Sequence, residues 1–171
     1  AVHPTTGVSA NKTVTVAQAA GLTSFSFGDI VYPENKDRLY KGQNPAGWIL
    51  VNATDANGNP VDANYLNNAA RVFASHGVKV CDDAGNNCFV TEPTTRKPAI
   101  RLDASGASVV PGKVNISVVV LLNPALNKSI TVDLVEEPYP AKVDIGTFDG
   151  VWAASDPAGT VAIPLTVYDQ F

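Results

Sequence analysis

The sequence predicts a mostly β protein: an immunoglobulin-like β-sandwich with one short helix and an extended N-terminal arm. Three observations support this fold class. Charged residues make up only 16% of the chain, against a usual value of roughly 25%, while hydrophobic residues make up 45%. Thirteen glycines and twelve prolines mark frequent turns. Short runs of alternating apolar and polar residues recur between these turns. A helical bundle would carry more Lys and Glu, and a disordered chain fewer apolar residues.

The predicted strands follow one another along the chain. Alternation over residues 22–27 and 129–135 is typical of strands buried on one face, and Gly28-Asp29 ends the first run. Residues 48–51 read as a short buried strand, and residues 55–60 as a turn. Further strands are expected at residues 13–16, 78–81, 88–91, 99–102, 113–122 and 160–168.

Residues 62–76 are the exception, because their apolar side chains recur at helical spacing. Asp62 is suited to cap the first turn, and Gly77 to end the helix. The residues that set the spacing are Tyr65, Leu66, Ala69, Ala70, Val72 and Phe73. The sequence therefore predicts one helix over residues 62–76.

The domain organisation is expected to be simple, with an extended arm over residues 1–12 and a single sandwich domain over residues 13–171. The N-terminal segment carries Val8, Val14 and Val16 in a Thr-rich context. Such a segment is able to add itself as a strand to an open sheet edge. We therefore treat these three valines as candidate assembly residues.

The last predicted strand is a second candidate assembly segment. Val161, Ile163, Leu165 and Val167 share one of its faces. Pro164 lies within the run and has no N–H to donate, so the strand is expected at a sheet edge or at a bulge.

The two cysteines, Cys81 and Cys88, enclose a run of turn-forming residues between two strand-like segments. This pattern predicts a β-hairpin closed at its base by a disulfide bond worth about 2–3 kcal/mol in the chain-entropy model. The alternative is a pair of reduced core thiols. Zinc is poorly supported, because only His3 and His76 are available as further ligands of its preferred kinds.

The expected location is extracellular or at a cell surface. A disulfide favours an oxidising compartment, and a chain that starts at Ala1 and contains no Met fits a protein numbered after removal of a signal peptide. Four Asn-x-Ser/Thr strings are potential glycosylation sites, and such strings also arise by chance. The net charge of −4 and the absence of basic clusters make nucleic acid an unlikely partner, and no apolar run is long enough to span a membrane.

No catalytic, cofactor or metal site is predicted, and the protein is not expected to be an enzyme. His3 falls in the arm, and His76 falls at the expected end of the helix, where the helix dipole favours a cation. The spacing of Asp55, Asn57 and Asn59 resembles the start of a calcium loop. Pro60 then stands where such a loop needs Gly, so a plain hairpin turn is the preferred interpretation. The neighbouring carboxylates Asp82/Asp83 and Glu136/Glu137 also fit solvated turns.

Aromatic side chains offer a candidate ligand surface. Trp152 follows Gly150 and is the aromatic residue expected to stack on a sugar, whereas Trp48 adjoins an apolar run and is expected in the core.

In layout the chain resembles the pilin subunits of bacterial chaperone–usher fimbriae. The matching parts are the arm around residues 13–16, the turn at residues 55–60, the strand at residues 113–122, and the final run 161–168 followed by Phe171. The resemblance implies that the arm of one subunit completes the sheet of the next. The local disulfide and the internal helix depart from that pattern.

The expected function is therefore that of a structural subunit of an extracellular fibre or pilus, whose partners are copies of itself. An adhesive or carbohydrate-binding sandwich that contacts a surface glycan or protein is the first alternative. A virion surface protein, either capsid or decoration protein, is the second.

Overall fold

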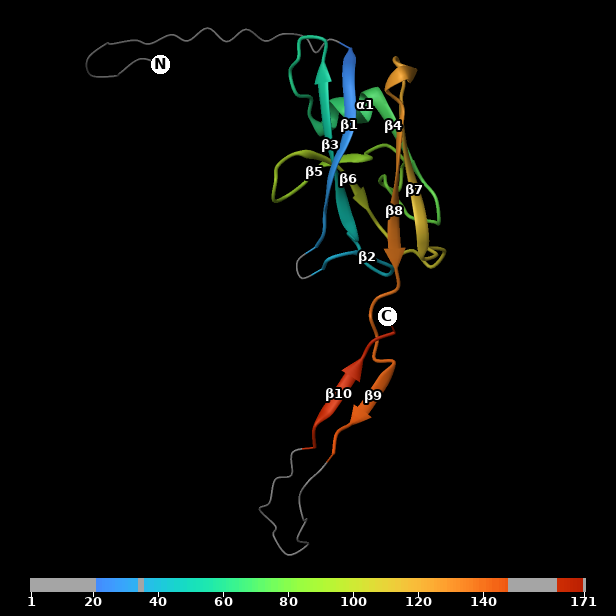
Figure 1. Cartoon of the computed structure of the whole chain (residues 1–171). Helices are drawn as coiled ribbons and strands as arrows, with labels where there is room; N and C mark the ends of the chain where they lie inside the picture. Colours follow the sequence, from blue (N-terminus) through green and yellow to red (C-terminus); the bar gives the residue numbers. More distant parts are fainter. Residues whose placement is uncertain (1–20, 34–35, 148–162, 171) are drawn as a thin grey trace, which may run out of the picture.

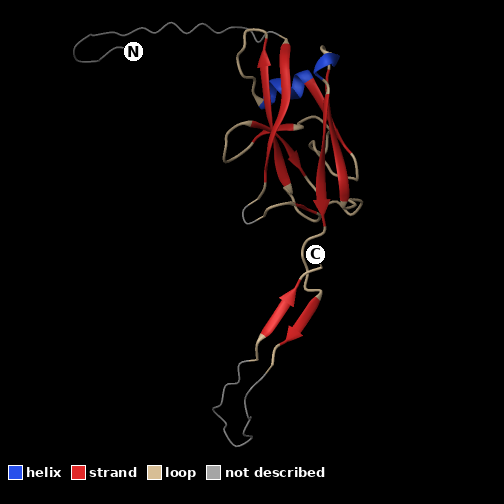
Figure 2. Cartoon of the chain, in the orientation of Figure 1, coloured by secondary structure: helices blue, strands red, loops and turns tan. Residues whose placement is uncertain are grey.

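The computed structural model describes residues 21–33, 36–147 and 163–170. They form two four-stranded sheets packed face to face and a separate two-stranded sheet (Figures 1 and 2). The prediction of a mostly β sandwich with one short helix is confirmed. The arm of residues 1–12 lies outside the described residues.

The strand order in the two large sheets is that of an immunoglobulin-like sandwich. The first sheet contains, in spatial order, β1 (Leu22–Val31), β3 (Gly47–Asp55), β6 (Pro98–Leu102) and β5 (Phe89–Thr91). The second contains β2 (Leu39–Tyr40), β8 (Lys128–Val135), β7 (Gly112–Val120) and β4 (Ala70–Ala74). If the two-residue β2 is set aside, the four-strand and three-strand orders match those of the seven-stranded constant-type domain. The last strand of this arrangement is β8, which belongs to the same chain.

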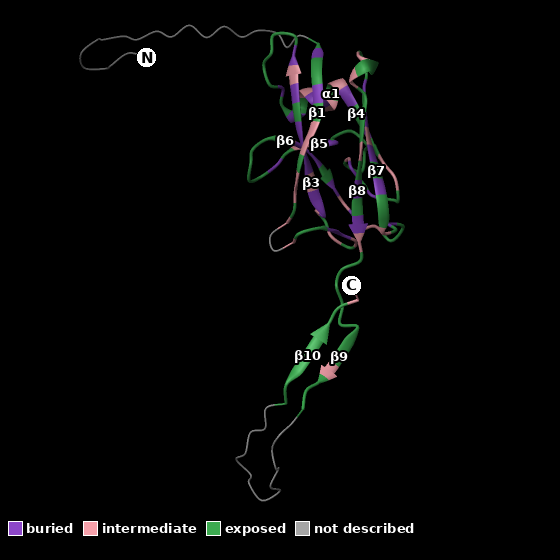
Figure 3. Ribbon diagram, in the orientation of Figure 1, coloured by how far each residue is buried: buried purple, intermediate pink, exposed green. Residues whose placement is uncertain are grey.

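The core forms because alternate residues of each strand point between the sheets. Along β7, Val114, Ile116, Val118 and Val120 are all at most 2% exposed. Strand β1 continues beyond its predicted end, because a register shift between Phe27 and Ile30 accommodates Gly28-Asp29 as a bulge. Figure 3 shows the buried residues gathered between the two sheets.

The predicted helix is correct in its first half and wrong in its second. Helix α1 spans Ala63–Ala69, and the Asp62 carboxylate accepts a hydrogen bond of 2.8 Å from the Tyr65 backbone N–H, as expected of a cap. From Ala70 the chain instead forms β4 and pairs with β7. The burial of Ala70 and Val72 satisfies a strand as well as a helix, and pairing with β7 decides between them.

The disulfide between Cys81 and Cys88 is confirmed, but the hairpin expected around it is not. Lys79 exchanges two backbone hydrogen bonds with Asp103, at the end of β6, whereas β5 pairs with residues 98–100 of β6 itself. The two cysteine-flanking segments therefore lie one after the other along β6, and residues 81–88 bulge out between them. The disulfide closes the base of this bulge in an edge strand.

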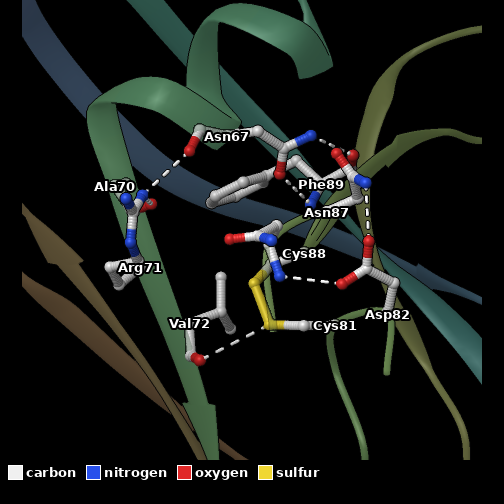
Figure 4. The surroundings of a disulfide bond; sticks show 10 residues. Asn67, Ala70, Arg71, Val72, Cys81, Asp82, Asn87, Cys88 and Phe89 are labelled. Carbon is white, nitrogen blue, oxygen red and sulfur yellow. Dashed lines mark hydrogen bonds between the residues drawn. A yellow bond between two sulfur atoms is a disulfide. The ribbon is translucent and has the colours of Figure 1, made fainter. Parts of the chain in front are cut away.

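The cysteine bulge is also anchored to α1. The side-chain amide of Asn67 donates to the backbone carbonyl of Phe89 and accepts from its N–H, at 2.8 Å in each case (Figure 4). Cys88 and Phe89 are both 2% exposed, so this end of the loop belongs to the core.

Replacing both cysteines, as Cys81→Ala with Cys88→Ala, is expected to lower the free energy of unfolding by about 2–3 kcal/mol, because the unfolded chain regains the freedom of an eight-residue loop. Denaturant unfolding of the variant and of the reduced wild-type protein will measure the effect. The reduced wild type serves as the control and should lose a similar amount. Equal stability of all three forms would contradict the prediction.

A buried carboxylate makes stability depend on pH. Glu92, 1% exposed, accepts hydrogen bonds from the backbone N–H groups of Thr94 and Thr95 in the turn between β5 and β6. Burial raises its pKa, but the hydrogen bonds from Thr95 and Thr94 outweigh burial and lower the pKa to about 2. Ionised Glu92 therefore stabilises the fold at pH values above its ordinary pKa of 4.5. That contribution is lost as the pH falls from about 4.5 to about 2.

The substitution Glu92→Gln should lower the melting temperature at pH 7 and flatten its dependence on pH between 4.5 and 2. Thermal unfolding of wild type and variant from pH 2 to pH 7 checks this. Glu136→Gln, which removes an exposed carboxylate, is the control. Parallel curves for wild type and Glu92→Gln would show that the Glu92 carboxylate is not the group responsible.

Candidate functional site

The C-terminal part of the expected sandwich domain forms a projecting hairpin. Strands β9 (Lys142–Ile145) and β10 (Leu165–Tyr168) pair with each other in antiparallel register and belong to neither large sheet. The hairpin extends away from the sandwich at the end where β8 finishes (Figure 1). A two-stranded hairpin on its own is marginally stable in water, and among the described strands β9 and β10 pair only with each other.

The hairpin has one apolar face, and this face is exposed. Val143 lies opposite Val167, and Ile145 lies opposite Leu165, so the four side chains project from the same side. They are 54–72% exposed, and Figure 3 shows the hairpin mostly in the exposed colour. We call this surface the hairpin face. Exposed apolar surface of this kind marks an interaction site more often than chance.

The opposite side of the hairpin is polar and satisfies its own charges. The Lys142 ammonium lies 2.8 Å from the Asp144 carboxylate and 5.1 Å from the centre of the Tyr168 ring. Lys142 and Tyr168 are themselves cross-strand partners. The hairpin is therefore amphipathic, with charge confined to one side.

The neck between the sandwich and the hairpin, residues 136–141, is held by the loop that surrounds β2. Glu137 accepts hydrogen bonds from Lys36 at 2.7 Å and from Gln43 at 3.3 Å, while Lys41 pairs with Glu136 at 3.2 Å. The Lys36 ammonium lowers the pKa of Glu137 and keeps this carboxylate ionised. Each exposed pair contributes little stability on its own, and together they join the neck to residues 36–43 around β2.

Gln170, which follows β10, also makes hydrogen bonds to the neck. The Gln170 side chain accepts from the Tyr139 N–H at 2.8 Å and donates to the Glu137 carbonyl at 3.1 Å. The Ala141 N–H donates to the Tyr168 carbonyl at 2.9 Å. These contacts hold the base of the hairpin closed.

An apolar groove lies at the opposite end of the sandwich, where β1 begins and β7 ends. Its volume is about 460 Å³, and none of the described residues that line it is charged. We call it the β1–β7 groove; its apolar lining includes Leu22, Tyr65, Ala69, Val120, Leu121 and Leu122. Leu122 is 94% exposed at its rim, an unusual position for a leucine.

The sandwich also presents an open sheet edge. Strand β8 pairs with β7 on one side, but on its other side β2 pairs only with Leu134 and Val135. No described strand pairs with residues 128–133 on that side. An unpaired edge of this length offers backbone N–H and C=O groups to an added strand.

The structure describes only some of the predicted site residues. Leu165 and Val167 share a face as predicted, and Ile163, just before β10, is 54% exposed. Strand β10 begins only at Leu165, so the expectation that Ile163 and Pro164 lie within the strand is wrong. Among the described strands β10 pairs only with β9 and is therefore an edge strand. The predicted positions Val8, Val14, Val16, Trp152 and Val161 lie outside the described residues.

His76 and Asp55, two of the residues considered for chemistry, make local hydrogen bonds. Helix α1 ends before His76, so its expected place at a helix terminus is wrong; its Nδ1 lies 2.8 Å from the Ser75 hydroxyl in the turn after β4. The Asp55 carboxylate accepts from the N–H groups of Asn57 and Asn59, both at 2.9 Å, and this confirms the hairpin turn. These hydrogen bonds, that from Asn59 above all, lower the pKa of Asp55. Within the described ranges, no group of three or more His, Cys, Asp or Glu side chains is placed to hold a metal ion.

Comparisons of the chain with protein-family models, with curated proteins and with solved structures each find no match. In the part of the chain that the structure describes, no helix is long and apolar enough to cross a membrane.

Sequence reasoning missed two parts of the site. Strand β9 was not predicted, although Val143 and Ile145 alternate with charged neighbours, because four residues are a weak signal. The β1–β7 groove brings together residues that are distant in sequence, and only the exposed Leu121-Leu122 pair at the end of β7 hints at it.

The hairpin requires a glycine at position 146. A Cβ atom there would stand 2.7 Å from Cγ of Pro164, whose carbonyl accepts the Gly146 N–H at 2.8 Å. We expect Gly146→Val to destabilise the hairpin by roughly 1–3 kcal/mol. This exceeds the free energy that stabilises an isolated two-stranded hairpin, which is marginal in water.

Amide hydrogen exchange in β9 and β10 should therefore accelerate in Gly146→Val, while the melting temperature of the sandwich stays unchanged. Gly106→Ala is the control, because a Cβ there makes only an ordinary contact of 3.5 Å with Val109. Unchanged protection of β9 and β10 would show that the close approach to Pro164 is not needed.

Proposed function

We propose that this protein is a structural subunit of an extracellular fibre, in which each copy is joined to the next through its terminal segments. The observation that carries the proposal is the hairpin face, four aliphatic side chains held in solvent on a projection from a complete sandwich. An element of this kind serves assembly better than it serves the stability of one chain.

The energetics favour a partner for the hairpin face. Full burial of a Val, Leu or Ile side chain is worth about 1.5–3 kcal/mol, and the hairpin face holds four of them, all more than half exposed. Part of that gain is offset by the loss of translational and rotational freedom on association. A contact of this size suits a repeating interface, in which many weak junctions act along one fibre.

The N-terminal arm is the second proposed junction. Residues 1–12 and the valines that follow would add as a strand to the open edge of β8 in a neighbouring subunit. Burial of Val8, Val14 and Val16 would contribute roughly 1.5–3 kcal/mol per side chain, before the cost of ordering the arm. The unpaired backbone of residues 128–133 supports β8 as the acceptor. The disulfide supports export to an oxidising compartment.

Deletion of residues 1–12 should abolish filaments seen by electron microscopy and raise the concentration needed for association at least tenfold. The sandwich should remain folded, because all of its described strands, from Leu22 onward, are kept. Filaments of normal length and abundance after the deletion would contradict the proposed role of the arm.

A matched pair of variants separates the apolar side chains from the arm as a whole. Val14→Asp with Val16→Asp should have the same effect as the deletion. Thr13→Asp with Thr15→Asp adds the same charge on the alternate face of an extended strand and should leave filaments intact.

A further inference from the structure

We propose that the hairpin face of one copy docks into the β1–β7 groove of the next copy. The inference rests on the proposed function in one respect, namely that copies of this chain join. It goes beyond that function by naming the surface that receives the hairpin and the residues on both sides of the junction.

The two surfaces lie at opposite ends of the sandwich. The groove is where β1 begins, and the hairpin leaves from the end of β8 (Figure 1). The ion pairs of Lys36 with Glu137 and of Lys41 with Glu136 join the neck to the sandwich at the end from which the hairpin leaves. A contact between two different surfaces, related by no two-fold axis, repeats from copy to copy and gives an open chain when the rotation between copies does not close into a ring. Surfaces at opposite ends of the molecule favour the open chain.

The two surfaces also match in chemistry. The hairpin face carries no charge, because Lys142 and Asp144 lie on the other side and pair with each other. The part of the chain that the structure describes contributes no charged side chain to the groove lining, and Leu121 and Leu122 are 47% and 94% exposed. Contact between them therefore leaves no buried charge without a partner.

The size of the groove suits a few aliphatic side chains. Its volume of about 460 Å³ falls within the roughly 300–1,000 Å³ of pockets that enclose compact ligands. A second copy is the occupant we favour because every copy brings both surfaces, always in equal numbers. Docking of the side chains at Ile145 and Leu165 would cover the exposed leucines at the rim.

Charged substitutions test the two surfaces separately. The hairpin variant carries Ile145→Asp with Leu165→Asp, and the groove variant carries Leu121→Asp with Leu122→Asp. All four side chains are at least 47% exposed, so the sandwich should fold in both variants. Each variant should raise the concentration for self-association, measured by sedimentation, at least tenfold.

Two controls add charge to exposed positions outside the proposed junction. Thr166→Lys places a charge on the other side of β10, opposite the Asp144 carboxylate, and Phe73→Asp replaces an aromatic residue on β4 that is 59% exposed. Both should associate like the wild type.

Mixing gives the decisive measurement. Residues 1–12 are deleted from both variants for this measurement, so that the arm junction cannot join them. The hairpin variant keeps its groove and the groove variant keeps its hairpin, so an equimolar mixture should stop at a one-to-one dimer. Cross-linking supplies a second readout, because the two native cysteines are bonded to each other and no free thiol competes. Ile145→Cys mixed with Leu122→Cys should form a disulfide-linked dimer, whereas Thr166→Cys mixed with Leu122→Cys should not.

Several outcomes would overturn the proposal. Wild-type association by the hairpin variant would show that the hairpin face is not a junction. Loss of association in only one of the two variants would show that its surface binds a part of the neighbouring copy other than its proposed counterpart. Deletion of residues 1–12 tests the arm junction separately. If the deletion abolishes filaments while both surface variants form them normally, the result supports the arm junction and contradicts the hairpin junction. The converse result would leave the hairpin junction and remove the arm.

Discussion

The pairing of β7 with β8 decides which part of the chain belongs to the core. Seven residue pairs join the two strands, from Gly112 with Leu134 to Val118 with Lys128. This register places Val132 and Leu134 in the core and brings the chain to the end of the sandwich at Val135. With β8 in place, the strand order of the sandwich is complete. The apolar residues of β9 and β10 come after this complete strand order and do not pack between the two sheets. The hairpin face is therefore exposed to solvent.

The complete strand order also refines what the resemblance to fimbrial subunits implies. In that family the arm of one subunit completes the sheet of the next, whereas here β8 of the same chain supplies the last strand. An added arm would therefore extend a sheet at the open edge of β8 and would not be needed for the sandwich to fold. Strand addition of this kind changes the strength of the junction, while the core of each copy remains independent of its neighbours.

Short-range patterns were sufficient to predict much of the sandwich. The alternation in residues 129–135 and the apolar run around Trp48 each correspond to a strand, because one buried face imposes a period of two. The pattern failed where a partner distant in sequence decides the outcome. Ala70 and Val72 suit a helix as well as a strand until β7 pairs with them. The segments that flank Cys81 and Cys88 are also compatible with pairing to each other in a hairpin. In the structure both segments pair along the line of β6 instead.

The candidate site was harder to predict for the same reason. Alternation marked Leu165 and Val167 as one face of a strand, but their partners Val143 and Ile145 lie about 20 residues earlier along the chain. The groove is assembled from β1, α1 and the end of β7, and no local pattern connects these three segments. Exposure, which distinguishes an assembly surface from a core strand, is a property of the fold and not of the alternation itself.

The way in which β8 leads into the neck has a mechanical consequence. In a fibre joined through the hairpin, tension along the fibre would enter each subunit at the neck and run along β8. Hydrogen bonds between antiparallel strands lie perpendicular to the strands, so such a force loads the seven β7–β8 pairs in shear and in parallel. They would have to break together, not one after another as in the unzipping of a hairpin. The strand that completes the fold would then also be the element that bears the load.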